Sequence, residues 1–133
     1  MLIESFNMKY LVVLSLVVAV ALATERRGQI ITAYHECVSG ELGGPNDPRK
    51  LVLQDNANVA KVGAAIFCIN KKTGVQNENG DINLTVLKQD VGHWTKDEAK
   101  ASEVVDECTK NKGADANETA FNALKCLMKK NEK

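Results

Sequence analysis

Beyond an apolar run near its beginning, the chain repeats hydrophobic residues at intervals of three and four, the period of an amphipathic α-helix. No segment alternates with the two-residue period of a strand. The pattern predicts an all-α protein of about six short helices, with loops over residues 40–45, 74–81 and 110–117. The expected apolar faces are Ile30, Ile31, Tyr34, Cys37 and Val38; Leu51 and Leu53; Val59, Val62, Ile66 and Ile69; Leu84, Leu87 and Val91; Ala101, Val104, Val105 and Cys108; and Ala120, Phe121, Leu124, Leu127 and Met128.

Several helix ends carry local signals. Gly40 would end the first helix, because glycine is common just past a helix C-terminus. Asp47 followed by Pro48 predicts an N-cap and the first residue of the next helix. Thr95 with Glu98 three residues later fits a capping box at the start of the fifth helix.

The helix over 59–69 is apolar on two sides. Val62 and Ile66 share one side, whereas Ala64 and Cys68 fall on another. A helix of this kind is expected to be central, with neighbours on both flanks.

The first 23 residues have the features of a secretory signal peptide. Lys9 precedes the uncharged run 11–22, and small residues stand before the expected cleavage after Ala23. Met8 would itself make an ordinary start. A membrane anchor is the alternative, but the run is short of the roughly 20 apolar residues that span a bilayer. Residues 24–133 then form one domain of 110 residues.

The charge and the cysteine content restrict the partners and the kind of cysteine site to be expected. The formal net charge is zero, so neither nucleic acid nor an anionic membrane surface is expected as a partner. An even number of cysteines in a secreted chain favours disulfides. A metal site is the alternative, but no close Cys-x-x-Cys pair occurs and neither His35 nor His93 has metal-motif spacing with a second ligand. Spacing alone leaves three disulfide connectivities open for Cys37, Cys68, Cys108 and Cys126.

The cysteine spacing carries a family resemblance. Between successive cysteines lie 30, 39 and 17 residues. With the signal peptide and six helices, this spacing resembles the insect odorant-binding proteins (pheromone-binding and general-odorant-binding proteins). Full members carry six cysteines, and here Ala64 and Asn117 stand where the missing pair would be, as in the four-cysteine Minus-C branch. The resemblance implies the pairings Cys37–Cys68 and Cys108–Cys126.

What the resemblance implies is a bundle stapled by two disulfides around an apolar cavity, and a secreted extracellular carrier of odorants, pheromones or similar lipid-like ligands. The implied partner is a small hydrophobic ligand, with an indirect role at a chemoreceptor, and the protein would be a monomer or weak dimer without a cofactor. The aromatic residues of the mature part are few, which suits an aliphatic ligand. The candidate lining residues, which could equally be ordinary core, are Ile30, Tyr34, Leu53, Val62, Ile66, Ile69, Leu87, Trp94, Val105, Phe121 and Leu124.

Two other functions remain open at this stage. One is a carrier of the same fold in haemolymph or a gland, and the other is a small secreted helical signalling or defence protein. No catalytic constellation is present, no metal site is expected, and the carboxylates are expected on solvated polar faces, so the chain is not expected to be an enzyme.

Asn83 and Asn117 each begin an Asn-x-Thr sequon, yet each also stands at a predicted helix start where its side chain could cap the helix without a glycan. The seven residues after Cys126 are too few and too polar to enter a cavity as a tail.

Overall fold

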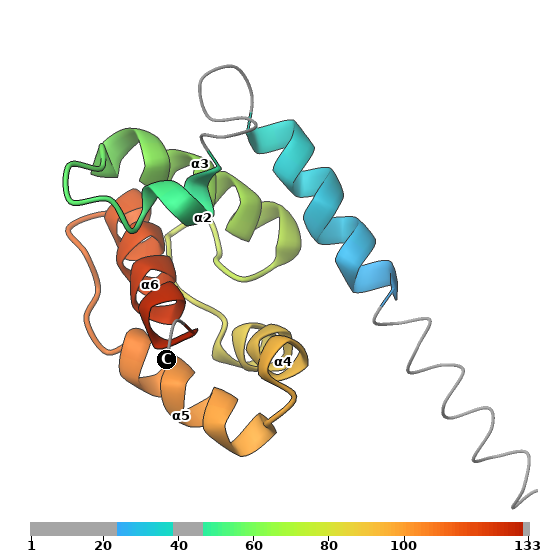
Figure 1. Cartoon of the computed structure of the whole chain (residues 1–133). Helices are drawn as coiled ribbons and strands as arrows, with labels where there is room; N and C mark the ends of the chain where they lie inside the picture. Colours follow the sequence, from blue (N-terminus) through green and yellow to red (C-terminus); the bar gives the residue numbers. More distant parts are fainter. Residues whose placement is uncertain (1–23, 39–46, 132–133) are drawn as a thin grey trace, which may run out of the picture. The chain divides into compact units, whose positions relative to one another are not determined.

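The computed structural model describes residues 24–38 and 47–131, and the chain falls into two units, Met1–Thr32 and Ala33–Lys133. The signal peptide, the loop over 40–45 and the predicted stop at Gly40 lie outside the described residues. A first helix covers residues 24–37, and the second unit continues with five more helices (Figure 1). These are α2 (Pro48–Leu51), α3 (Val59–Thr73), α4 (Leu84–Thr95), α5 (Glu98–Cys108) and α6 (Ala116–Asn131).

The all-α fold class is confirmed. The described residues contain no strand; they hold a single antiparallel bridge, between Gln76 and Ile82. That bridge closes the turn-rich loop between α3 and α4, where the sequence pattern predicted a loop.

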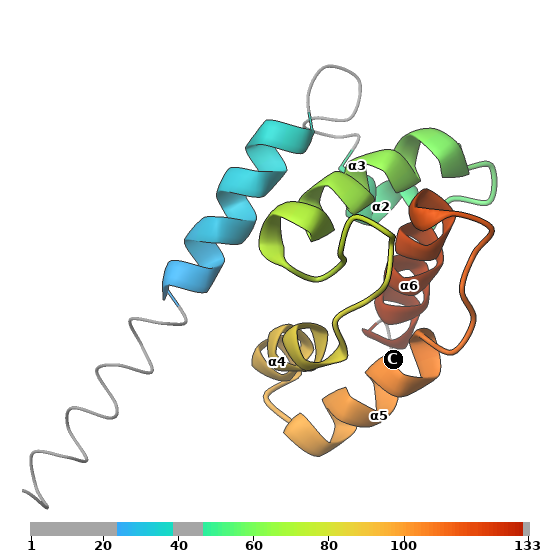
Figure 2. The same ribbon diagram turned by 180° about the vertical axis from the view of Figure 1, so that it is seen from behind.

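Helix α6 lies between the other helices of the second unit. It packs against α2 and α3 on one side and against α5 on the other, while α4 packs against α5. The two opposite views show this order, with α2 and α3 at one end of α6 and the α4–α5 pair at the other (Figures 1 and 2). Helix α6 therefore takes part in both halves of the core.

The helix starts at Asp47 and Asn83 are as predicted. Asp47 caps α2 by accepting a hydrogen bond from the backbone N–H of Arg49 at 2.9 Å, with Pro48 as the first helical residue. Asn83 caps α4 through Oδ1, which accepts from the N–H of Val86 at 3.2 Å. Each side chain satisfies one of the N–H groups that a helix leaves without an internal partner.

The predicted capping box at Thr95 is wrong by two residues. Thr95 is the last residue of α4, and its hydroxyl donates to the carbonyl of Val91 at 3.0 Å. Lys96 takes a left-handed conformation with φ of 58° and ends α4, so the chain is free to start α5 at Asp97. Asp97 is the N-cap, accepting from the N–H of Lys100 at 3.1 Å.

The predicted cap at Asn117 is also wrong. Asn117 is the second residue of α6, and the carboxylate of Asp115 accepts from the N–H of Glu118 at 2.8 Å in the capping position. Aspartate and asparagine cap equally well, so residue preference alone does not choose between Asp115 and Asn117. The loop before α6 is correspondingly shorter than predicted.

The apolar faces of α2 and α3 differ in detail from the pattern. In α3, Val62 and Ile66 are buried as expected, but Ala64 is exposed, so the second apolar side is covered only in part. Helix α2 ends at Leu51, which places Leu53 in the following turn. The residues after Cys126 continue α6 to Asn131, and Leu127 among them is buried in the core.

Candidate functional site

The first of two apolar clusters lies where α2, α3 and α6 meet, and we call it the Phe121 cluster. Its buried members come from the turn after α2, from one face of α3 and from α6: Val52, Val62, Ile66, Ala120 and Phe121. Partly buried residues pack around them, namely Leu51, Leu53, Ala57, Phe67, Leu124 and Met128. This rim of large apolar side chains that keep some contact with water gives the cluster a surface on which a hydrophobic molecule could still bury area.

The second cluster lies between α4, α5 and the end of α6, and we call it the Val105 cluster. Its buried members are Val75, Leu87, Val91, Ala101, Val105, Cys108 and Leu127. The predicted α5 face is confirmed, since Ala101 and Val105 are fully buried. The partly buried residues around it are Ile82, Val86, Val104 and Cys126, a smaller set than the leucines, phenylalanine and methionine around the Phe121 cluster.

The structure brings seven of the eleven candidate lining residues into these clusters. Leu53, Val62, Ile66, Phe121 and Leu124 belong to the Phe121 cluster, while Leu87 and Val105 belong to the Val105 cluster. The remaining four are placed elsewhere: Ile30 in the first unit, Tyr34 and Ile69 at half-buried positions, and Trp94 near the end of α4.

Trp94, one of the candidate lining residues, belongs to neither cluster. Its side chain is 59% exposed, and it is the most exposed of the large hydrophobic residues in the described part of the chain. It stands in the last turn of α4, before the left-handed Lys96 turns the chain toward α5. The indole therefore reports on the surface near the α4–α5 turn rather than on the core.

Two disulfides hold the elements of the second unit together. Cys37, at the end of the first helix, is bonded to Cys68 of α3, with 5.8 Å between their Cα atoms. Cys108, at the end of α5, is bonded to Cys126 of α6, with 5.4 Å between their Cα atoms. Both pairings are those that the family resemblance implies. No free cysteine occurs in the described residues, which contain all four.

Helices α3 and α6 come close together at Gly63. A Cβ atom at this position would clash with the carbonyl oxygen of Asn117, and would lie 2.9 Å from the carbonyl carbon and 3.3 Å from the Cβ of the same residue. Gly63 is buried, so the contact is backbone on backbone. Sequence reasoning singled out Ala64 opposite Asn117 and missed Gly63, although a glycine inside an apolar helix is a signal of close packing.

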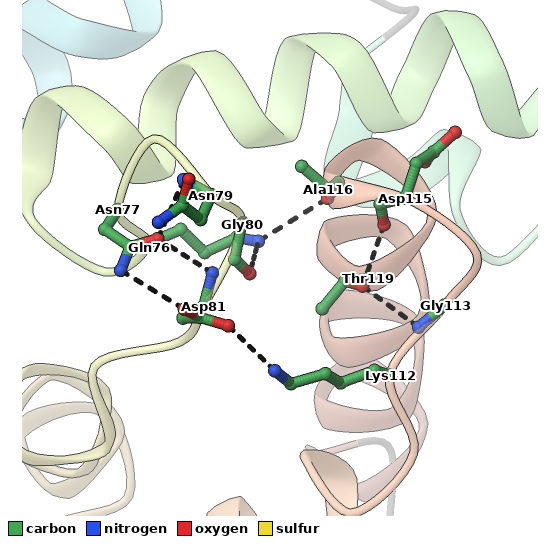
Figure 3. A network of polar contacts seen from close by, with 10 residues as sticks. All are labelled: Gln76, Asn77, Asn79, Gly80, Asp81, Lys112, Gly113, Asp115, Ala116 and Thr119. Carbon is green, nitrogen blue, oxygen red and sulfur yellow. Dashed lines mark hydrogen bonds and ion pairs between the residues drawn. The ribbon is translucent and has the colours of Figure 1, made fainter.

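A polar network joins the loop after α3 to the loop before α6 (Figure 3). Gln76 is 2% exposed, and its amide nitrogen donates to the carbonyl of Gly80 at 2.9 Å and to that of Ala116 at 3.5 Å. Its amide oxygen accepts from Asn70 of α3 at 2.7 Å. Lys112 closes the exposed edge of the network by an ion pair with Asp81 at 2.7 Å.

The same two loops touch at Gly80, which has a φ of 88° and comes so close to Ala116 that a Cβ would lie 2.6 Å from the Cβ of Ala116. Glycine adopts this left-handed conformation without strain, and it leaves room for the approach. The network therefore fixes the start of α6, which carries residues of both clusters. Gln76 was not recognised in the sequence, because a single glutamine between loop residues gives no pattern.

Two carboxylates contradict the expectation that all of them lie on solvated faces. Asp90 in α4 is 6% exposed, and Asp47 is 8% exposed. Burial raises the pKa of Asp47, but the hydrogen bonds and the positive charge of Arg49 lower it by more, so this pKa lies below its usual value. The Arg49 guanidinium pairs with the carboxylate at 2.8 Å.

The interior offers apolar contact and little polar chemistry. Within the residues described, every buried side-chain nitrogen or oxygen has a hydrogen-bond partner. Residues 24–38 and 47–131 contain no group of three or more His, Cys, Asp or Glu side chains arranged to hold a metal ion. In the same part of the chain, none of the helices combines the length and the apolar character needed to cross a membrane.

Comparison with known proteins settles the family. The model of the PBP/GOBP family matches residues 20–130, which is most of the chain. The chain belongs to the PBP/GOBP family. This PBP/GOBP member is similar to the B1 protein of Tenebrio molitor, with 28% identity over 120 residues that make up 87% of this chain and 89% of that protein. No solved structure matches the chain. The resemblance drawn from the cysteine spacing is thereby confirmed.

Proposed function

We propose that the protein is a secreted carrier that reversibly binds small hydrophobic molecules, such as odorants, pheromones or similar lipid-like compounds, in an internal cavity. The observation that carries the proposal is the Phe121 cluster in a chain of the PBP/GOBP family. Secretion is supported by the two disulfides, which persist in oxidising compartments, and by the signal-like residues 1–23.

The chemistry of the interior selects the class of ligand. Because the buried polar side-chain atoms of the described residues are already hydrogen-bonded to the protein, a polar ligand would have to replace existing bonds. An apolar ligand pays no such cost, and its burial contributes roughly 25 cal/mol per Å² before the costs of association. The binding free energy then comes from hydrocarbon contact alone. Such binding is reversible, as a carrier that must also release its ligand requires.

We assign the main contact surface to the Phe121 cluster rather than to the Val105 cluster. Its rim includes Phe67, Leu124 and Met128, which are large and only partly buried. Methionine is flexible and adapts to ligands of different shape. The Val105 cluster has no phenylalanine or methionine at its rim and contains Cys108, which is bonded to Cys126, and this supports a role in holding the fold.

A dye-displacement titration tests this proposal. A fluorescent apolar dye should bind the purified protein and be displaced by long-chain alcohols, fatty acids or terpenoids with roughly micromolar affinity. Leu124→Ala should weaken dye binding by up to about tenfold, because it removes apolar contact at the rim. The matched variant Leu87→Ala, in the Val105 cluster, should lower stability and leave the affinity of the folded protein close to that of the wild type.

Two outcomes would count against the proposal. If none of these three classes of ligand competes with the dye, the carrier function fails and a signalling or defence protein acting through protein contacts becomes the better explanation. If Leu87→Ala lowers the affinity and Leu124→Ala does not, the protein is a carrier but its contact surface is the Val105 cluster. The tissue in which the protein accumulates would separate an olfactory carrier from one in haemolymph or a gland.

A further inference from the structure

We propose that the folded, secreted protein carries an N-linked glycan on Asn83 and none on Asn117. Both residues begin an Asn-x-Thr sequon, Asn83-Leu84-Thr85 and Asn117-Glu118-Thr119. The inference rests on the secretion included in the proposed function, because such glycans are added in the secretory pathway. The two sequons are equivalent in sequence, and the structure makes them different.

The first sequon is accessible along its whole length. Asn83, Leu84 and Thr85 are all exposed, Leu84 by 42%. The backbone of Asn83 is held in place, since its N–H donates to the carbonyl of Val75 at 2.7 Å and its carbonyl accepts from the N–H of Leu87 at 3.0 Å. The side chain of Asn83 therefore projects from a hydrogen-bonded backbone position at the protein surface.

The capping role and the glycan use different atoms of Asn83. The cap needs Oδ1, which accepts from the N–H of Val86 at 3.2 Å. The glycan is attached at Nδ2, where transfer from a lipid-linked diphosphate oligosaccharide forms a bond to the sugar C1, breaks the C1–O bond to the diphosphate and releases one proton from the amide. Glycosylation keeps the carbonyl of the side-chain amide, so α4 keeps its N-cap.

The second sequon is built into the contact between α6 and α3. Asn117 is only partly exposed, and its backbone carbonyl and Cβ lie against Gly63. Thr119 is 8% exposed, and its hydroxyl donates to the carbonyl of Asp115 at 2.8 Å and accepts from the N–H of Gly113 at 2.9 Å (Figure 3). A glycan on Asn117 would begin beside the close contact between Gly63 of α3 and the backbone of α6.

The glycan is transferred before the chain folds. The fold then decides which of the modified chains can complete their packing. A chain modified at Asn83 can complete its packing, because the sugar extends from an exposed helix start next to the exposed Leu84. A chain modified at Asn117 would have to keep a bulky group beside the buried Gly63 contact, which would oppose the packing of α6 on α3. Secreted folded protein is therefore modified at the first sequon.

The test is the intact mass of full-length protein secreted by insect cells, before and after treatment with a peptide N-glycosidase. The enzyme converts a glycosylated asparagine to aspartate, so peptide mapping locates the site. We expect the wild type to lose a glycan mass with conversion at Asn83 alone. Thr85→Ala removes the sequon and leaves the Asn83 cap intact, and it should be secreted without a glycan. Asn83→Asp keeps a capping oxygen and should behave in the same way.

Glycan on Asn117 in the folded product, or wild-type protein in the medium without any glycan, would overturn the inference. Unmodified protein in the medium that still binds an apolar dye would leave the proposed carrier function standing and refute the glycan alone. Protein retained in the cells with residues 1–23 uncleaved would refute secretion, and the glycan on Asn83 with it.

Discussion

Replacing Gly63 by alanine tests the close contact between α3 and α6 with the smallest possible change. The added Cβ would meet the carbonyl group of Asn117, which belongs to the backbone of α6 and cannot rotate away as a side chain could. Overpacking of a well-packed site costs about 1–3 kcal/mol, and a rigid backbone neighbour favours the upper half of that range. Alanine recovers about 1 kcal/mol as the better helix former. The expected net loss in the free energy of unfolding is about 1–2 kcal/mol.

The assay is thermal unfolding followed by circular dichroism. For a unit of this size, 1 kcal/mol corresponds to about 4 °C, so Gly63→Ala should lower Tm by about 4–8 °C. Gly92→Ala is the matched control, because Gly92 also lies inside a helix and a Cβ there would be 3.7 Å from the nearest side-chain atom, an ordinary contact. This control should raise Tm slightly through helix propensity alone. A Tm for Gly63→Ala equal to or above that of the wild type would refute the close α3–α6 contact.

Three further predictions use the disulfides, the Asp47–Arg49 ion pair and the missing cysteine pair. Replacing both cysteines of Cys37–Cys68 or of Cys108–Cys126 by alanine should cost about 3–4 kcal/mol in denaturant unfolding, and a loss below about 1 kcal/mol would contradict their role as staples. Because the pKa of Asp47 is lower in the folded than in the unfolded protein, its contribution is complete above the usual value of about 3.9 and is lost as the pH falls through the folded pKa. Asp47→Asn should therefore lower Tm at pH 7 by an amount that disappears in acid, whereas a pH-independent difference would show that the charge plays no part. Ala64→Cys with Asn117→Cys should form a third disulfide under oxidising conditions, as judged by a thiol count; two thiols that stay free would remove the structural basis for placing the missing pair there.

Much of the fold follows from local patterns. The face of α5 was predicted because Ala101, Val105 and Cys108 recur at helical spacing, and all three are buried. Asp47 and Pro48 identify a helix start by chemistry that acts within a few residues. Such features depend on neighbours in the sequence, which is why they could be predicted without the structure.

The errors arise where several local solutions compete. Thr95 and Asp97 can both cap a helix, and the choice was made by the left-handed turn at Lys96. Asn117 and Asp115 compete in the same way at the start of α6. Trp94 was a candidate lining residue, but its place at the end of α4 leaves it exposed.

The site shows the limit of pattern reasoning most clearly. Apart from Val52 and Val75, the buried apolar residues of the two clusters lie on faces predicted by periodicity. Their division between the Phe121 and Val105 clusters depends on how α6 packs against α3 and α5. The buried Gln76 and the contacts at Gly63 and Gly80 depend on residues some 35 to 55 positions away in the chain. No local pattern contains that information.

The central claim is that the protein encloses one small apolar ligand, and calorimetric titration at several temperatures tests it most directly. A long-chain aliphatic alcohol titrated into the purified protein should bind with one-to-one stoichiometry and roughly micromolar affinity. The binding should show a negative heat-capacity change, the signature of apolar surface removed from water. An absence of saturable binding by alcohols, fatty acids and terpenoids alike, or binding with no heat-capacity change, would contradict the carrier account.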